Sequence, residues 1–189
     1  MRFGRLLVGA FLALTLLAGS VRAADTYTVD PVHSSLLFRV KHLDCGYIYG
    51  RFNQYSGSFA FDDKNPSECK LEMEVKIDSL DTANADRDKH VKGPDFFNAK
   101  EFTTMTFKAT SMKAQDEKNY EVTGDLTIHG VTKQVTVKLE RLGTAKAMGK
   151  TRSGWETTFS INRSDFGMKF GIPAISDEIR IIVAMEGIR

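Results

Sequence analysis

The chain has four histidines, the side chains most often used in metal binding and acid–base catalysis: His33, His42, His90 and His129. None of them stands in a spacing typical of a zinc site, such as H-E-x-x-H or histidine combined with paired cysteines. No acid pair with the pattern of a buried general acid and base stands out, and no G-x-S-x-G nucleophile elbow occurs. The sequence therefore predicts no metal site and favours a protein that is not an enzyme.

A second group of chemically capable residues lies in the stretch RDKHVKGPDFFNAKEF, residues 87–102. A charged set of this kind usually forms a solvated helix face. At the mouth of a pocket, however, arginine can hold an anionic head group, because guanidinium pairs well with carboxylate and phosphate. We take four residues as candidates for contacts to such a head group: His33, Arg87, His90 and Arg163.

The elements that would position these residues are β-strands. Residues 70–78, KLEMEVKID, alternate apolar and charged side chains with period two, which is typical of a half-buried strand. The alternation recurs to give about eight strands, and His129 and Gly130 form a tight hairpin turn between Ile128 and Val131. Sequential strands of this number predict an all-β fold, an eight-stranded antiparallel up-and-down barrel. A β-sandwich is the alternative.

One short helix interrupts the strands, over residues 83–92. Thr82 or Asn84 can cap its start, and Gly93 followed by Pro94 ends it. Phe96 and Phe97 follow on a tight turn. They either plug one end of the core or form a lid beside a ligand channel.

The interior of an eight-stranded barrel is either filled by side chains or holds one small ligand. Ten residues of strand span about 33 Å, long enough for a tunnel shaped like an extended chain. The inward positions are apolar, so a ligand there would be a lipid tail. The predicted tail contacts are Phe38, Val40, Phe59, Met73, Val75, Ile77, Phe96, Phe97, Met105, Phe107, Leu126, Ile128, Trp155, Phe159, Ile181 and Val183.

Residues 1–23 have the features of a cleaved signal peptide, which leaves residues 24–189 as a single domain. Arg2 and Arg5 precede an apolar run over residues 6–18, and a small-x-small cleavage site ends at Ala23. The run is shorter than the roughly 20 residues of a transmembrane helix, so no integral membrane span is expected. Removing three of the 26 basic residues leaves 23 against 24 acidic ones. This balance does not suggest nucleic-acid binding, and the expected location is the periplasm.

Cys45 and Cys69 are the two cysteines, and an oxidising compartment would favour a disulfide. In a meander, however, one whole strand separates them, about 30 Å. A disulfide needs Cα atoms within about 7 Å. We therefore predict no bond between Cys45 and Cys69.

Several stretches carry a resemblance to a known family. In chain order they are YTVDPVHSSLLFRVKHL, SGSFAFD, SLDTANADRDKHVKGPDFFNAKEFTTMTFKAT and VTGDLTIHGVTKQV. They resemble the YceI-like, polyisoprenoid-binding proteins across essentially all of residues 24–189. The matching positions are Asp30, His33, Ser34 and Phe38 in the opening signature, Asp81, Arg87, Asp88, His90, Phe96 and Phe97 in the insertion, and Phe107, Gly124, Leu126, Gly130, Val131, Thr132 and Lys133 around the central hairpin.

The resemblance implies a lipocalin-like barrel whose elongated cavity binds a polyisoprenoid, such as a quinone or prenyl phosphate, or a fatty acid or amide. It also implies a periplasmic carrier without enzymatic activity. No cofactor is expected apart from such a lipophilic ligand, and a homodimer is possible. Two alternatives stay open: an enzyme acting on an isoprenoid or quinone through His33, His42 or Arg163, and a structural barrel with a filled core.

Overall fold

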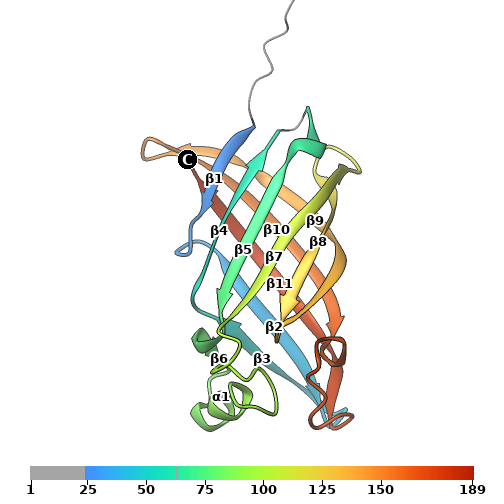
Figure 1. Ribbon diagram of the computed structural model, residues 1–189. Helices are drawn as coiled ribbons and strands as arrows, with labels where there is room; N and C mark the ends of the chain where they lie inside the picture. The colour runs from blue at the N-terminus through green and yellow to red at the C-terminus, as the bar shows by residue number, and fades with distance from the viewer. Residues whose placement is uncertain (1–23, 63) are drawn as a thin grey trace, which may run out of the picture.

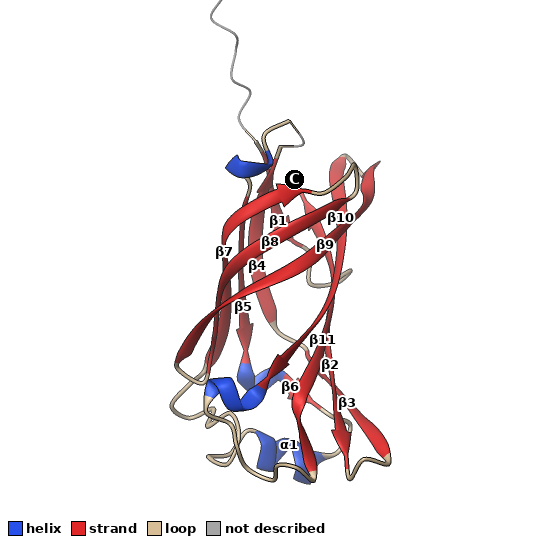
Figure 2. Ribbon diagram, turned by 90° about the vertical axis from the view of Figure 1, so that its right-hand side faces the viewer, coloured by secondary structure: helices blue, strands red, loops and turns tan. Residues whose placement is uncertain are grey.

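The computed structural model describes residues 24–62 and 64–189, so the predicted signal peptide lies outside the described residues (Figures 1 and 2). The strands are β1 Asp25–Val29, β2 Ser35–His42, β3 Gly46–Phe52, β4 Tyr55–Phe61, β5 Lys70–Lys76, β6 Leu80–Asp81, β7 Thr104–Ala114, β8 Asn119–Ile128, β9 Val131–Ala147, β10 Lys150–Asn162 and β11 Ile175–Ile188. The helices are α1 Ala85–Val91 and the short 3₁₀ segments η1 Pro66–Glu68, η2 Ile77–Ser79 and η3 Arg163–Phe166.

These strands form one antiparallel sheet that closes on itself where β1 pairs with β11. Three pairs of strands are each one long strand with an interruption. Residues 30–34 separate β1 from β2, residues 53–54 separate β3 from β4, and η2 separates β5 from β6. Counted this way the barrel has eight strands, which confirms the predicted fold class.

The predicted turn and helix signals are confirmed. His129 and Gly130 both have positive φ, 53° and 73°, as a two-residue hairpin turn with the twist of the flanking strands requires. The helix α1 begins after Asn84, whose side chain accepts a hydrogen bond from the Arg87 amide at 2.9 Å. Among the described residues no helix is long and apolar enough to cross a membrane.

The barrel is closed at one end only. The end that carries α1, the β2–β3 turn and the β8–β9 turn is called the α1 end, and the end with η1 and the C-terminus is called the distal end (Figure 1). Toward the α1 end, the β9–β10 pairing stops at Leu139 and Thr157, and the β5–β7 pairing stops at Lys76 and Thr104. Figure 2 shows the strands diverging there into two sheets.

Aromatic side chains fill the distal end. Trp155 is only 2% exposed, and its ring centroid lies 4.8 Å from that of Phe61, 5.5 Å from Tyr120 and 6.1 Å from Phe59. The Trp155 indole N–H donates to the Ser153 hydroxyl at 3.0 Å, so its one polar atom is satisfied. This end of the interior is solid.

The two cysteines lie at opposite ends of the barrel, as the meander predicts. Cys45 lies in the β2–β3 turn at the α1 end, whereas Cys69 lies between η1 and β5 at the distal end. The Cys69 Sγ instead accepts a hydrogen bond from the Asp62 amide at 3.3 Å. The predicted separation of the two thiols is confirmed.

Candidate functional site

A cavity of about 750 Å³ lies at the α1 end, between the β2–β3–β11 sheet and α1. One cross-strand row of its wall is Ile48, Val40 and Ile179, which pair directly across β3, β2 and β11. The side chains before and after them in each strand point to the outside, because successive strand residues alternate faces. The cavity reaches the surface beside α1, where Asp86 and His90 are exposed.

A second, narrower space of about 140 Å³ continues the cavity toward the distal end. Leu36, Met105, Ile128 and Ile181 line both spaces, so the two adjoin. The lining of the narrower space is almost wholly apolar and ends at Trp155. The interior is therefore an apolar tunnel that is wide at the α1 end and closed at the distal end.

Most of the predicted tail contacts line this tunnel. The wide part is lined by Phe38, Val40, Phe96, Phe97, Met105, Ile128 and Ile181. The narrow part is lined by Met73, Val75, Met105, Phe107, Leu126, Ile128, Trp155, Phe159, Ile181 and Val183.

Phe59 and Ile77 line neither part. Phe59 faces inward as its strand position predicts, but it stacks on Tyr27 with ring centroids 4.9 Å apart, beyond Trp155. The space there is only about 10 Å³. Ile77 belongs to η2, where the strand pattern is interrupted, and it is fully buried in packed core. The alternation of apolar and polar residues identifies which side chains point into the barrel. It does not show whether neighbouring side chains already fill the space in front of them.

Phe96 and Phe97 are adjacent in the chain, but their rings pack against different parts of the α1 end. Phe97 packs edge-on against Phe52 with centroids 5.8 Å apart, inside the core of the α1 end. Phe96 contacts the rings of His90 and Phe170, at 5.2 and 5.4 Å, close to where the cavity meets the surface. Both also line the cavity, so this turn forms part of its wall.

Arg87 is held in a fixed orientation at the cavity wall. Its Nε donates to the Thr82 hydroxyl at 2.8 Å and its Nη2 to the Thr82 carbonyl at 2.7 Å. Thr82 is itself held by Asp88, which accepts from the Thr82 amide at 2.8 Å. Arg87 takes part in none of the ion pairs found in the described chain, and it lines the cavity beside the exposed Asp86.

Arg163 also lines the cavity, but its guanidinium is hydrogen-bonded to backbone carbonyl groups. It is 3% exposed, and it donates to the carbonyl oxygens of Met168, Ile175 and Ser176 at 2.8, 2.9 and 3.0 Å. Burial lowers the pKa of its guanidinium, and nearby Asp177 opposes that shift. Arg163 therefore anchors the segment that joins η3 to β11 and has fewer donors left for a head group than its position suggested.

His90 and His42 both line the cavity. His90 shares a hydrogen bond of 2.9 Å with Asp95 and is half exposed. His90 therefore lies at the cavity entrance, where the sequence analysis predicted a contact to a ligand head group.

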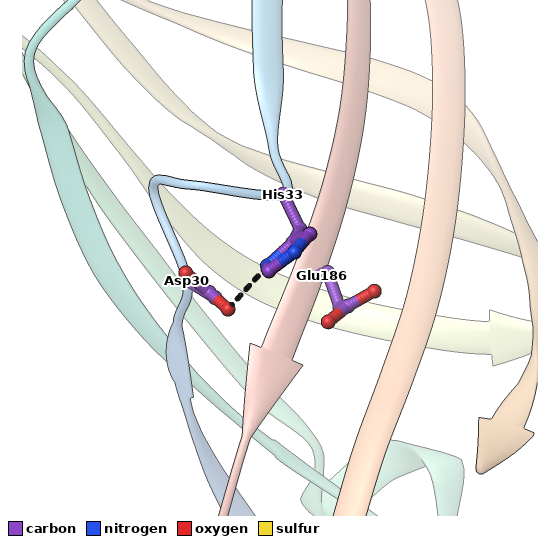
Figure 3. Close-up of side chains that lie close together, drawn as sticks. All are labelled: Asp30, His33 and Glu186. Carbon is purple, nitrogen blue, oxygen red and sulfur yellow. Dashed lines mark hydrogen bonds and ion pairs between the residues drawn. The ribbon is translucent and has the colours of Figure 1, made fainter. Parts of the chain in front are cut away.

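His33 lies outside the cavity lining, in a cluster with Asp30 and Glu186 (Figure 3). Its Nδ1 lies 2.8 Å from Asp30, and Arg152 contacts both Asp30, at 3.0 Å, and Glu186. The hydrogen bond from His33 holds the pKa of Asp30 down to about 2, with help from the Val32 amide and Arg152. Because the Arg152 guanidinium already supplies the positive charge between the two acids, this cluster ties β1 to β10 and β11 as an ion-pair network.

The structure also adds residues that were not predicted for the site. Thr82, Ile48, Met168 and Ile175 line the cavity. Ile48 and Ile175 lie on strands whose alternation could have identified them. Thr82 could not have been identified, because its role depends on α1 folding back so that Arg87 and Asp88 both bond to it.

Comparison with known proteins gives consistent matches. A family model described as the YceI-like domain matches residues 27–187. A protein of Pseudomonas paraeruginosa named as a UPF0312 protein is 41% identical over 175 residues, covering 91% of each chain. A crystal structure of a Campylobacter jejuni YceI protein superposes with a TM-score of 0.72 at 34% identity, over 79% of this chain and 89% of that one. A polyisoprenoid binding domain from Saccharophagus degradans shares the fold, with a TM-score of 0.69 at 16% identity, over 88% of this chain and 98% of that one.

Proposed function

The chain belongs to the YceI-like family, and on this premise we propose that it is a periplasmic carrier that holds one long apolar amphiphile inside the barrel. A polyisoprenoid, such as a quinone or a prenyl phosphate, is the first cargo to test, and a long-chain fatty acid or amide is the second.

The apolar tunnel at the α1 end carries this proposal. Its wide part, about 750 Å³, falls within the roughly 300–1,000 Å³ of pockets that enclose small ligands. Each Å² of apolar surface that a tail buries there contributes about 25 cal/mol, less the free energy of ordering the tail. A barrel with a filled core would not leave this space.

The polar groups beside α1 give the cargo a direction. A tail enters toward Trp155, and its head group stays near Arg87 and His90, where water reaches it. Thr82 fixes the Arg87 side chain before any cargo arrives, so little side-chain freedom is lost on binding. Binding and release need no covalent chemistry.

Two further observations support the class of cargo and the compartment. The Saccharophagus degradans domain with this fold is described as polyisoprenoid binding. Residues 1–23 have the composition of an export signal, and bacterial polyprenols and quinones are membrane lipids that an exported carrier would meet.

Native mass spectrometry of protein purified from its own periplasm, without detergent, tests the proposal. We expect a bound mass that organic extraction removes and that tandem mass spectrometry identifies as a long-chain lipid. The same spectrum gives the subunit count and so tests the possible homodimer. An empty protein that also fails to take up prenols, quinones and fatty acids in vitro would exclude the carrier function.

A further inference from the structure

The α1 end carries most of the exposed large apolar side chains of the described chain. Of eight such residues, five lie at this end, and we call them the mouth rim: Leu43, Tyr47, Tyr49, Phe170 and Ile172. Their exposed fractions run from 40% for Ile172 to 60% for Leu43. Clustered exposed apolar side chains are unusual on a soluble protein and mark interaction sites.

Three residues of the mouth rim, Leu43, Phe170 and Ile172, lie in the β2–β3 turn and in the segment before β11, which border the cavity entrance. Tyr47 and Tyr49 lie beside them on the outer face of β3. The Leu43 amide donates to the Ala174 carbonyl at 2.7 Å, which joins the β2–β3 turn to the segment that holds Phe170 and Ile172. The Phe170 ring lies 5.4 Å from both Phe96 and His90, and these two residues line the cavity. A molecule that leaves the cavity beside α1 therefore passes close to the rim.

Basic side chains surround these apolar ones. Lys169 is exposed next to Phe170, and Arg39, Lys41 and Arg180 lie on the outer face of β2 and β11, opposite the cavity wall. The Arg39 guanidinium lies 4.3 Å from the Tyr47 ring centroid. The acids beside them are Asp44, bonded to Lys41 at 2.9 Å, and Glu178. On this outer face the basic side chains therefore outnumber the acidic ones, whereas the acids Asp86 and Asp95 lie beside the cavity entrance.

The surface combines exposed aliphatic and aromatic side chains with lysine and arginine. This composition is typical of a protein surface that lies in a membrane interface. Basic residues there add attraction to anionic head groups. A water-soluble protein partner would be matched by the apolar tips as well, but it would give no reason for their position around the exit of a lipid tunnel.

We propose that the mouth rim docks on the surface of a phospholipid bilayer that contains anionic lipids. In the docked state the cavity entrance faces the bilayer, so a tail moves between membrane and barrel without crossing open water. The transfer step rests on the proposed carrier function, whereas docking itself does not.

Flotation of the full mature protein with phospholipid vesicles tests the docking. The vesicles contain phosphatidylethanolamine and phosphatidylglycerol, and a second set contains phosphatidylcholine alone. The test variant is Leu43→Ser/Phe170→Ser/Ile172→Ser. The control is Leu142→Ser/Met148→Ser in β9 and the β9–β10 turn of the distal end, where the two side chains are 55% and 95% exposed.

We expect the wild-type protein and the distal control to bind the anionic vesicles alike. Each apolar side chain lost from the interface weakens partition by about tenfold, so the triple variant should bind about a thousandfold more weakly. Binding to phosphatidylcholine vesicles should be weaker than to anionic ones and less sensitive to salt.

Transfer provides the second measurement. Protein loaded with a fluorescent long-chain fatty acid should deliver it to acceptor vesicles at a rate that rises with vesicle concentration, and the triple variant should be slower by a similar factor with unchanged affinity for the acid. The docking proposal is wrong if the wild-type protein does not bind vesicles, or if the triple variant binds them as tightly as the wild type. Protein that docks but takes up no lipid leaves docking intact and refutes the carrier function instead.

Discussion

The two ends of the barrel have the same strand pattern but different interiors. At the distal end eight paired strands enclose Trp155, Phe61 and Tyr120, whose rings touch edge to face. At the α1 end β9 and β10 continue without pairing to each other, and about 750 Å³ is left between the walls.

The difference teaches that hydrogen-bond closure decides whether this barrel is solid or hollow. An eight-stranded ring that is fully paired has an interior that large side chains can fill. Where the β9–β10 ladder ends although both strands continue, these strands separate and the same kinds of apolar side chain no longer reach each other. Stability should then depend on the distal end and binding on the α1 end.

The largest expected effect is the loss of packing at the distal end. Trp155→Ala should lower the free energy of unfolding by about 3–5 kcal/mol, because the rings around it cannot collapse into the space. Ile179→Ala in the cavity wall is the control and should cost less than about 2 kcal/mol, since that side chain already borders empty space. Urea unfolding of both variants measures this, and equal losses would contradict a solid distal end.

The next effect is on binding at the hollow end. Val40→Trp adds a ring inside the cavity and should displace about 100 Å² of buried tail, which lowers affinity by about 2.5 kcal/mol, close to a hundredfold. Fluorescent lipid titration measures the affinity.

The matched change at the solid end is Val122→Trp. Val122 is fully buried and borders only the narrow space of about 140 Å³, which is too small for a tryptophan side chain in addition to its lining, so this variant should be destabilised by about 1–3 kcal/mol or more. Val40→Trp should unfold at nearly the wild-type urea concentration. If the two variants lose the same stability, the cavity is not open space in solution.

A smaller effect should distinguish the contribution of the head group to the affinity from that of the tail. Arg87→Gln should weaken binding of a long-chain carboxylate by about tenfold, because a charge-assisted hydrogen bond is lost. It should change the affinity for the matched primary amide much less. Lys89→Gln on the same helix is exposed and does not line the cavity, so it should change neither affinity. An equal loss for acid and amide would show that Arg87 does not contact the head group.

The smallest effect concerns the ion-pair network of Asp30, Arg152 and Glu186, which ties β1 to β10 and β11. The pKa of Asp30 is lowered from 3.8 to about 2, so its contribution to stability is present above about pH 4 and is lost as the pH falls toward 2. Thermal unfolding across this range should show a smaller decrease in Tm for Asp30→Asn than for the wild type. Identical pH profiles would show that Asp30 does not keep its low pKa in solution.

Some features of the fold and site were predictable from local patterns. Alternation in residues 70–78 predicted β5, the turn His129-Gly130 predicted the β8–β9 hairpin, and Asn84 predicted the start of α1. These succeed because each depends on a few neighbouring residues. Most of the tunnel lining followed from the same alternation, the number of strands predicted the barrel, and the resemblance to the YceI-like family implied the class of cargo that we propose.

Other features depended on residues far apart in the chain. His33 was taken for a head-group contact, but Arg152 and Glu186, more than a hundred residues away, hold it and Asp30 outside the tunnel. Arg163 was predicted as a head-group contact, but its guanidinium donates to backbone carbonyls in the segment before β11 and at the start of that strand. A sequence pattern records a residue type and its neighbours, not the partners that folding brings to it.

The sequence by itself determined which side chains face inward, where the strands turn and where the helix begins, because period, turn chemistry and capping act over a few residues. Only the tertiary structure decided which inward side chains meet an opposite wall and which face empty space. The distance between opposite walls is set where the β9–β10 ladder ends, and the end of a ladder depends on how two strands twist past each other, which no single strand encodes.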